Sequence, residues 1–225
     1  MIPVVCRSGK QLLFLSRNRE VSLFAMAELE KKSSEHEVHH WETLSESSLV
    51  ETPIFSLKSK RCRHPKRGSE GDFYVIESND WVNVLPITVD HQVILVNQYR
   101  FGVECESWEL PGGVIDDGEN DPVEAGLREL REETGYTSKS AELMQSIRPN
   151  PAIQNNFCHL VVARNCVLSE QIKWDEHEEI SMKLVPIEEV FEMAFRGEIF
   201  HSLSVTALFF YYPELQKLKA RRREG

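Results

Sequence analysis

Three glutamates near the middle of the chain are spaced so that a single helix face would carry all of them. Glu129, Glu132 and Glu133 stand at positions i, i+3 and i+4, and residues at this spacing are neighbours on a helix surface. Like charges this close destabilise a helix by roughly a few tenths of a kcal/mol per pair, so a positive group should offset them. Magnesium is a natural candidate, because this hard cation prefers oxygen ligands and bridges carboxylates to substrate phosphates.

The same stretch also has a purely structural interpretation. Arg128 lies four residues after Glu124 and four residues before Glu132, and opposite charges at this spacing form ion pairs along exposed helices. Most charged helices are of this kind. The surrounding residues therefore have to decide between a metal site and a solvated helix.

The residues around the glutamates predict a turn that leads into a helix. Pro111-Gly112-Gly113 interrupts the preceding strand pattern, and Pro122 is a residue tolerated in the first turn of a helix. Gly135 is placed as a C-terminal stop. We therefore expect a helix over residues 122–134, about three turns long.

Taken together, residues 113–136, GVIDDGENDPVEAGLRELREETGY, resemble the Nudix box. That pattern is a glycine, five residues, a glutamate, seven residues and then R-E-apolar-x-E-E-x-G-apolar, with Tyr136 as the last apolar residue. The chain departs from it at one point, because eight residues separate Glu119 from Arg128. We place the extra residue in the loop at 120–121, which leaves the helix unchanged and the role of Glu119 open.

The resemblance implies a magnesium-dependent hydrolase, with manganese as a possible substitute. Glu129 and Glu133 would be the main metal ligands, and Glu132 and the carbonyl of Gly112 would complete the sites. Arg128 would hold the glutamates in place through ion pairs rather than touch substrate. Glu132 and Arg128 accordingly belong to the expected catalytic set.

Residues outside the box resemble the ADP-ribose pyrophosphatase branch of the family. Glu109-Leu110-Pro111-Gly112-Gly113 matches the Glu-Leu-Pro-x-Gly sequence that precedes the box in that branch, and Arg100 in Gln98-Tyr99-Arg100 matches a substrate-contacting arginine. Pro151 stands where the branch carries a proline, so Arg100 and Pro151 are the expected substrate-binding residues. Arg100 could equally be a surface arginine that closes a strand. The chain departs from the branch at residues 155–159, where many members have an acidic pair.

An acidic loop, Trp174-Asp175-Glu176-His177-Glu178-Glu179-Ile180, precedes a predicted strand. Such runs are usually solvated surface. In the family, a loop at this position carries a glutamate that helps to activate the attacking water. Glu178 matches it best, with Glu176 as the alternative.

The resemblance implies an α/β fold, the α/β/α Nudix sandwich with a mixed sheet, preceded by a small antiparallel β subdomain. We expect an N-terminal tail or mis-assigned start at 1–40, the β subdomain at 41–78 and the hydrolase domain at 79–225. The residue pattern predicts strands at 49–58 and 73–77 around a basic turn region at 60–71. It predicts further strands at 81–89, 92–98, 141–147, 157–163 and 180–186, helices at 187–196 and 202–212, and a solvated tail at 217–223.

Composition restricts the compartment and the partners. The formal charge of −10 disfavours nonspecific nucleic-acid binding and favours divalent cations. The scattered cysteines, with no C-x-x-C pair, indicate reduced thiols rather than disulfides or a zinc site, and no apolar run is long enough to span a bilayer. We expect a cytoplasmic protein that binds a small-molecule nucleotide and forms a homodimer through the β subdomain. The cysteines are Cys6, Cys62, Cys105, Cys158 and Cys166.

The expected reaction is attack of water on a diphosphate phosphorus, which would convert ADP-ribose to AMP and ribose 5-phosphate. Metal ions would be needed because a diphosphate anion repels hydroxide. Two alternatives stay open: a Nudix enzyme for another nucleotide sugar, and a catalytically weak protein of this fold that binds nucleotides as a sensor.

Overall fold

The computed structural model describes residues 38–169 and 179–224. Within these ranges, no helix is both long and apolar enough to cross a membrane. In chain order the elements are β1 (Glu42–Glu51), β2 (Ser56–Arg63), β3 (Glu70–Glu77), β4 (Trp81–Thr88), β5 (Gln92–Arg100), β6 (Cys105–Glu109), β7 (Gly112–Val114), α2 (Pro122–Thr134), β8 (Tyr136–Thr137), β9 (Ser140–Ile147), β10 (Cys158–Leu168), β11 (Ser181–Pro186), α3 (Ile187–Phe195) and α4 (Ser202–Glu224).

The larger sheet is mixed and has eight strands. Its central path runs β11-β5-β4-β10-β8, while β6 pairs with β5, β7 with β4 and β9 with β10. β10 runs parallel to β4, with Val161 opposite Val84, whereas β5 is antiparallel to both β4 and β11. This order brings β7, which precedes the glutamate-bearing helix, against the central strand β4.

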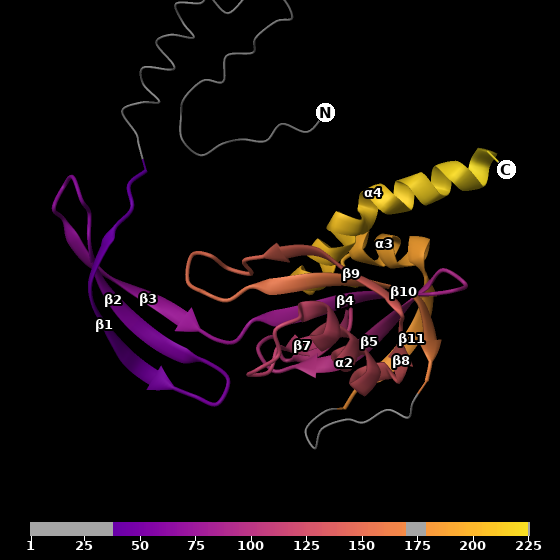
Figure 1. Ribbon diagram of the computed structural model, residues 1–225, viewed down its shortest axis with the longest axis horizontal. Coiled ribbons are helices and arrows are strands. Elements are labelled where there is room, and N and C mark those ends of the chain that lie inside the picture. Colours follow the sequence, from indigo (N-terminus) through magenta and orange to yellow (C-terminus); the bar gives the residue numbers. More distant parts are fainter. Residues whose placement is uncertain (1–37, 170–178, 225) are drawn as a thin grey trace, which may run out of the picture. The chain divides into compact units, whose positions relative to one another are not determined.

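Both faces of this sheet are buried by helices (Figure 1). Successive residues of a strand point to opposite faces, and β4 follows this alternation: Val82 and Val84 pack with Ala125 and Leu130 of α2. The other face packs against α3 and α4 through a second apolar cluster, which includes Leu85, Ile87, Leu160, Val162, Val190, Met193, Leu208 and Leu215. The expected α/β/α sandwich is therefore confirmed.

The last helix is longer than the sequence pattern predicted. We expected a helix over 202–212 and a solvated tail over 217–223, but α4 continues to Glu224 through Pro213. Proline removes one helical hydrogen bond, so other contacts must hold the turns after it. Leu215 is buried, and Glu214 Oε2 accepts a hydrogen bond from Arg164 Nη2 of β10 at 2.8 Å.

A separate antiparallel sheet, in the order β1-β2-β3, precedes the larger one. The predicted strand at 49–58 is wrong in extent, because a turn at Thr52–Phe55 divides it: Thr52 Oγ1 accepts a hydrogen bond from Phe55 N at 3.0 Å. The predicted turn region at 60–71 is also too long, since β2 runs to Arg63 and β3 begins at Glu70.

Cross-strand ion pairs explain why these basic residues form a strand. Lys58 and Lys60 of β2 lie 3.2 and 2.9 Å from the carboxylate of Glu46 on β1, and both also pair with Glu77 on β3. Opposite charges on neighbouring strands stabilise a sheet, and this pairing leaves no trace in the hydrophobic pattern.

Candidate active site

The glutamate-bearing helix α2 begins and ends where its local sequence requires. Asp121 caps its N-terminus by accepting a hydrogen bond from Val123 N, and such a cap typically contributes about 1 kcal/mol. Gly135 ends the helix with φ of 75°, a left-handed conformation that suits glycine. The predicted bounds of 122–134 agree with the structure, so Glu129, Glu132 and Glu133 lie on the last turns of the helix, as expected.

Two glycines of β7 let these glutamates approach the backbone closely. Gly112 N donates a hydrogen bond to Glu133 Oε2 at 3.1 Å, and the Glu133 side chain is buried. A Cβ at Gly113 would lie 2.6 Å from Glu129 Oε1, and one at Gly112 would lie 2.2 Å from the carbonyl oxygen of Val82. Only glycine fits at Gly112, because the clash there is with backbone, whereas a side chain at Gly113 would displace the carboxylate of Glu129.

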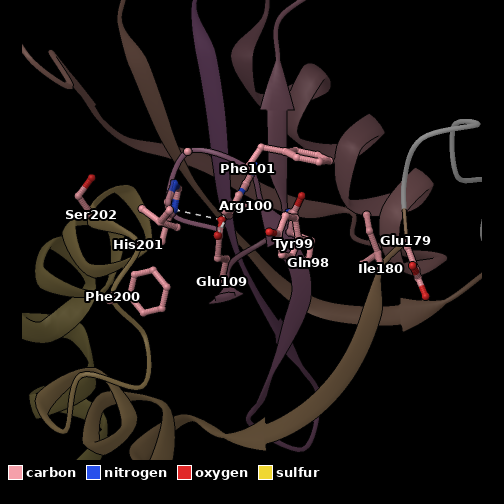
Figure 2. A pocket seen from close by; sticks show the side chains of 12 residues that line it. Gln98, Tyr99, Arg100, Phe101, Glu109, Glu179, Ile180, Phe200, His201 and Ser202 are labelled. Carbon is pink, nitrogen blue, oxygen red and sulfur yellow. Dashed lines mark hydrogen bonds and ion pairs between the residues drawn. The ribbon is translucent and has the colours of Figure 1, made fainter. Parts of the chain in front are cut away.

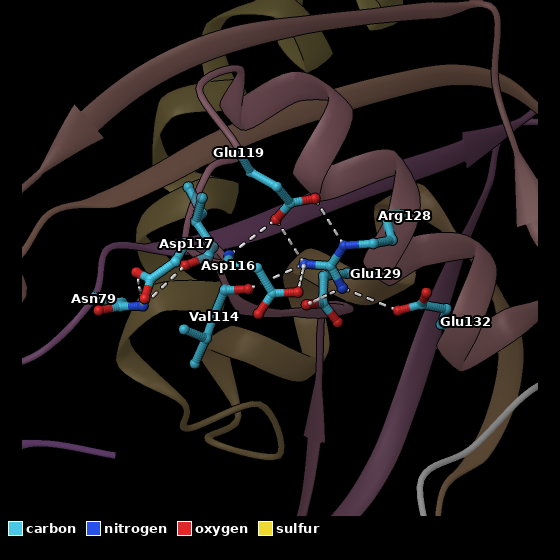
Figure 3. A network of polar contacts seen from close by, with 9 residues as sticks. Asn79, Val114, Asp116, Asp117, Glu119, Arg128, Glu129 and Glu132 are labelled. Atoms are coloured by element: carbon cyan, nitrogen blue, oxygen red, sulfur yellow. Dashed lines mark hydrogen bonds and ion pairs between the residues drawn. The ribbon is translucent and has the colours of Figure 1, made fainter. Parts of the chain in front are cut away.

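Arg128 ties the helix to the loop before it (Figure 3). Its Nε and Nη2 donate to the two carboxylate oxygens of Glu119 at 2.9 and 3.0 Å. Its Nη1 donates to Glu129 at 2.9 Å and to Glu132 at 3.0 Å, and Nη2 also donates to the Val114 carbonyl. The extra residue in the box therefore does not prevent Glu119 from reaching the helix.

The charges in this network shift the pKa values in opposite directions. Hydrogen bonding to Glu119 raises the pKa of the Arg128 guanidinium, and the Arg128 guanidinium lowers the pKa of Glu119 below its usual 4.5. One partly buried cation thus offsets the mutual repulsion of the helix carboxylates. The ion pairs expected for a charged helix exist, but they lie beside the Gly112–Gly113 strand rather than on a solvated helix face.

The donor set fits a divalent metal in its chemistry. Among the described residues, no group of three histidine, cysteine, aspartate or glutamate side chains is arranged to hold a metal ion. Glu129 and Glu132 both accept hydrogen bonds from Arg128 Nη1. The donors themselves are carboxylate and carbonyl oxygens, which are the ligands that magnesium prefers.

A cleft of 810 Å³ lies beside this region (Figure 2). In its floor, Glu109 is fully buried and accepts two hydrogen bonds from Arg100, from Nε at 2.8 Å and from Nη2 at 2.5 Å. His201 Nδ1 lies 3.3 Å from the same carboxylate. Exposed aromatic residues of the walls, Tyr99, Phe101 and Phe200, complete the surface that a ligand would meet.

A smaller cleft of 220 Å³ joins the large cleft to the glutamate-bearing helix. Arg100 and His201 line both clefts, and Gly112 and Gly113 line the smaller one. Glu129 and Glu133 contact these same glycines, so the carboxylates of α2 lie next to residues that line the smaller cleft.

The remaining site residues predicted from the sequence differ in whether they line a cleft. Arg100 does line the clefts, but it is also anchored to Glu109, a partner that the sequence reasoning did not assign. Pro151 is exposed in the turn after β9 and is not among the residues that line either cleft. Glu178 and Glu176 lie outside the described residues, whereas the adjacent Glu179 lines the large cleft.

Two residues of the cleft were missed as functional candidates. Glu109 was noted only as part of a motif, although an acidic residue between a strand and Leu110-Pro111 was a possible signal. His201 has no local signal, because Glu109, the charged partner of its imidazole, comes from a strand that is distant in sequence. Cys158 was interpreted as a core residue, and the structure agrees: it is fully buried, and burial raises the pKa of its thiol to about 12.

Comparison with known proteins identifies the family. The family model described as "NUDIX domain" matches residues 79–206. An ADP-ribose pyrophosphatase of Bacillus subtilis is 30% identical over 172 residues, which cover 74% of this chain and 92% of the relative. An ADP-ribose pyrophosphatase of Mycobacterium tuberculosis is 27% identical over 173 residues, with 76% of this chain and 82% of the relative covered.

A solved structure supports the fold independently. The crystal structure of an ADP compounds hydrolase superposes with a TM-score of 0.73 at 22% identity and covers 81% of this chain and 98% of that one. The resemblance noted at the glycine turn and glutamate helix therefore extends over the whole sandwich. The chain belongs to the NUDIX domain family and is a Nudix hydrolase.

Proposed function

We propose that this hydrolase cleaves the diphosphate bond of a nucleoside diphosphate linked to another group, with ADP-ribose converted to AMP and ribose 5-phosphate. The observation that carries the proposal is the position of Glu129 and Glu133 against the Gly112–Gly113 backbone, beside clefts lined by Arg100. The names of the relatives, ADP-ribose pyrophosphatase in two cases, support the choice of substrate.

The proposed cofactor is magnesium, with manganese as a substitute. Glu129 and Glu133 would be its main ligands, and Glu132 and the carbonyl of Gly112 would complete the sites. When bound, such ions neutralise phosphate charge and lower the pKa of a bound water. Arg128, which now holds Glu129 and Glu132, would keep the carboxylates in position.

Arg100 would bind the substrate diphosphate. Its Nε and Nη2 donate to Glu109, while its Nη1 has no partner among the described residues. The buried carboxylate fixes the guanidinium plane and raises the pKa of Arg100, so the side chain stays charged. A guanidinium anchored on one edge can donate from the other to a phosphate oxygen.

Glu178 is proposed as the general base that takes a proton from the attacking water, with Glu176 as the alternative. The two can be separated by comparing the turnover of Glu178→Gln and Glu176→Gln over a range of magnesium concentrations. Loss of a general base should lower kcat by roughly 10²- to 10⁴-fold with little change in KM. Full activity of Glu178→Gln, with loss in Glu176→Gln, would move the role to Glu176, and recovery of the rate at high magnesium would indicate a ligand instead.

We also propose that the β1-β2-β3 sheet forms a homodimer contact. Its strands and their first turn expose the large apolar side chains of Leu49, Val50, Ile54, Phe73 and Tyr74. Burial of exposed apolar surface against a second copy would stabilise such a contact. Sedimentation of the wild type beside Phe73→Glu tests this. A dimer that becomes a monomer in the variant supports the contact, and a dimer that persists refutes it.

The substrate proposal is tested by incubating the protein with magnesium and a panel of nucleotide sugars. Products are separated by chromatography, and binding is measured by calorimetry without metal. Formation of AMP and ribose 5-phosphate from ADP-ribose, abolished in Glu133→Gln, is the expected result. Preferential cleavage of another nucleotide sugar would change the substrate, and binding without any cleavage would favour the sensor alternative.

A further inference from the structure

His201 occupies a position in the clefts that the proposed mechanism does not yet use. It immediately precedes α4, and its carbonyl accepts a hydrogen bond from Val205 N at 3.0 Å. Its imidazole lines both clefts. Figure 2 shows the ring directed at Glu109 through one nitrogen, with the other nitrogen turned away from that carboxylate.

The neighbours of the ring determine which nitrogen carries the proton. Nδ1 lies 3.3 Å from Glu109 Oε2 and 3.2 Å from Ser204 Oγ. The Glu109 carboxylate, already bound by Arg100, can only accept hydrogen bonds. A lone pair on Nδ1 would face that anion, so we assign the proton of the neutral ring to Nδ1. Nε2 has no partner among the described residues, and in a neutral ring it is a hydrogen-bond acceptor.

The surroundings keep the ring neutral. Burial lowers the pKa of His201 below its usual 6.5, Glu109 opposes that change and Arg100 reinforces it. Among the described residues, Glu109 on β6 and Arg100 on β5 are the charged groups that shift the pKa of the imidazole, and Glu179 also lines the large cleft. The described residues of β4 and β7 that line the smaller cleft are uncharged. In neutral solution Nε2 therefore offers a lone pair to the cleft.

We propose that His201 is a substrate-contacting residue whose Nε2 accepts a hydrogen bond from a sugar hydroxyl of the nucleotide. The inference rests on the proposed function and extends it to substrate recognition. Arg100 can only donate and so selects phosphate oxygens, whereas a neutral His201 beside it selects a donor. A sugar phosphate carries both groups within one short unit, which matches two neighbouring side chains held by the same Glu109.

The test uses calorimetry of ADP-ribose binding to the full chain without metal. His201→Asn is the decisive variant, because the asparagine amide can still donate to Glu109 but has nothing at the position of Nε2. We expect an unchanged melting temperature and a Kd weakened about five- to tenfold, the size of one neutral hydrogen bond. The matched control is His91→Asn, since His91 is exposed in the β4–β5 turn and its φ of 57° is one that asparagine tolerates.

The pH dependence distinguishes a hydroxyl from a phosphate contact. Protonation turns Nε2 into a donor, so wild-type affinity should weaken as the pH falls from about 8 to about 5.5, and His201→Asn should lose this dependence. A wild-type Kd in His201→Asn would overturn the proposal, and so would wild-type binding that tightens at low pH.

Failure of the proposed function is a separate outcome. If the wild type binds ADP-ribose without cleaving it, hydrolysis of that substrate is refuted while the Kd values of the variants still decide the role of His201. If the wild type does not bind ADP-ribose at all, both proposals are overturned.

Discussion

Replacing Arg128 by lysine should destabilise the fold although the positive charge is kept. The arginine fork makes five hydrogen bonds, two to Glu119, one each to Glu129 and Glu132, and one to the Val114 carbonyl. A lysine ammonium is a point charge that cannot reach all of these partners at once. Because Arg128 joins the preceding loop to α2, the loss should be measurable as a decrease in the free energy of unfolding.

The expected magnitude follows from the burial of Arg128. Its side chain is 22% exposed, between surface pairs, which contribute about 0–1 kcal/mol, and buried pairs, whose disruption costs about 3–5 kcal/mol. We expect a loss of about 2 kcal/mol, which for a protein of this size lowers Tm by about 4–8 °C. A double-mutant cycle with Glu119→Gln should give a coupling of about 1 kcal/mol.

Thermal unfolding followed by circular dichroism is the assay, with Arg196→Lys as the matched control. Arg196 also pairs with two glutamates, Glu189 at 2.7 Å and Glu198 at 2.6 Å, but on the surface, so its variant should melt close to the wild type. Equal and small effects of the two substitutions would refute the reasoning, because burial would then have no influence on the pair.

Three further predictions concern single groups. Glu133→Gln should lower kcat at least about a hundredfold with the fold intact, and near-normal activity at saturating magnesium would remove Glu133 from the mechanism. Arg128 lowers the pKa of Glu119 below its usual 4.5. The stability that the Glu119 carboxylate contributes is therefore fully present above pH 4.5 and is lost as the pH falls through the lowered pKa. The Tm difference between wild type and Glu119→Gln should therefore shrink from about pH 6 to about pH 3, whereas a constant difference would contradict this linkage. Burial raises the pKa of Cys158 to about 12 and of Cys166 to about 11, whereas Cys105 is exposed. At about pH 8 a thiol reagent should therefore label Cys105 in the folded protein and label Cys158 and Cys166 only after denaturation. Mass spectrometry of the labelled peptides measures this.

Local features of the chain were sufficient to predict α2 and the family. The helix depends on its own cap, its own glycine stop and the spacing of its apolar residues, all of which are adjacent in sequence. The Nudix box is equally local, so the α/β/α sandwich followed from the family resemblance that this one stretch carries, and it is confirmed.

The extents of β2 and α4 could not be predicted in this way. β2 contains Lys58 and Lys60, whose partners lie on other strands, and α4 passes through Pro213 because residues beyond it pack on the sheet. A pattern of residues along the chain contains no information about charges or apolar surfaces contributed from elsewhere.

By itself the sequence determined the family and the helix that carries Glu129, Glu132 and Glu133. The glycines at 112 and 113, which the sequence pattern placed in a turn, belong to strand β7 in the structure. Only the tertiary structure decided that Arg100, Glu109 and His201 meet in one cleft. They come from β5, β6 and the start of α4, and nothing in the residues beside them specifies the partners. Sheet order and helix packing set the distances among these three side chains. The free energy that brings segments so far apart in sequence together comes from burial of the whole core rather than from the three polar groups.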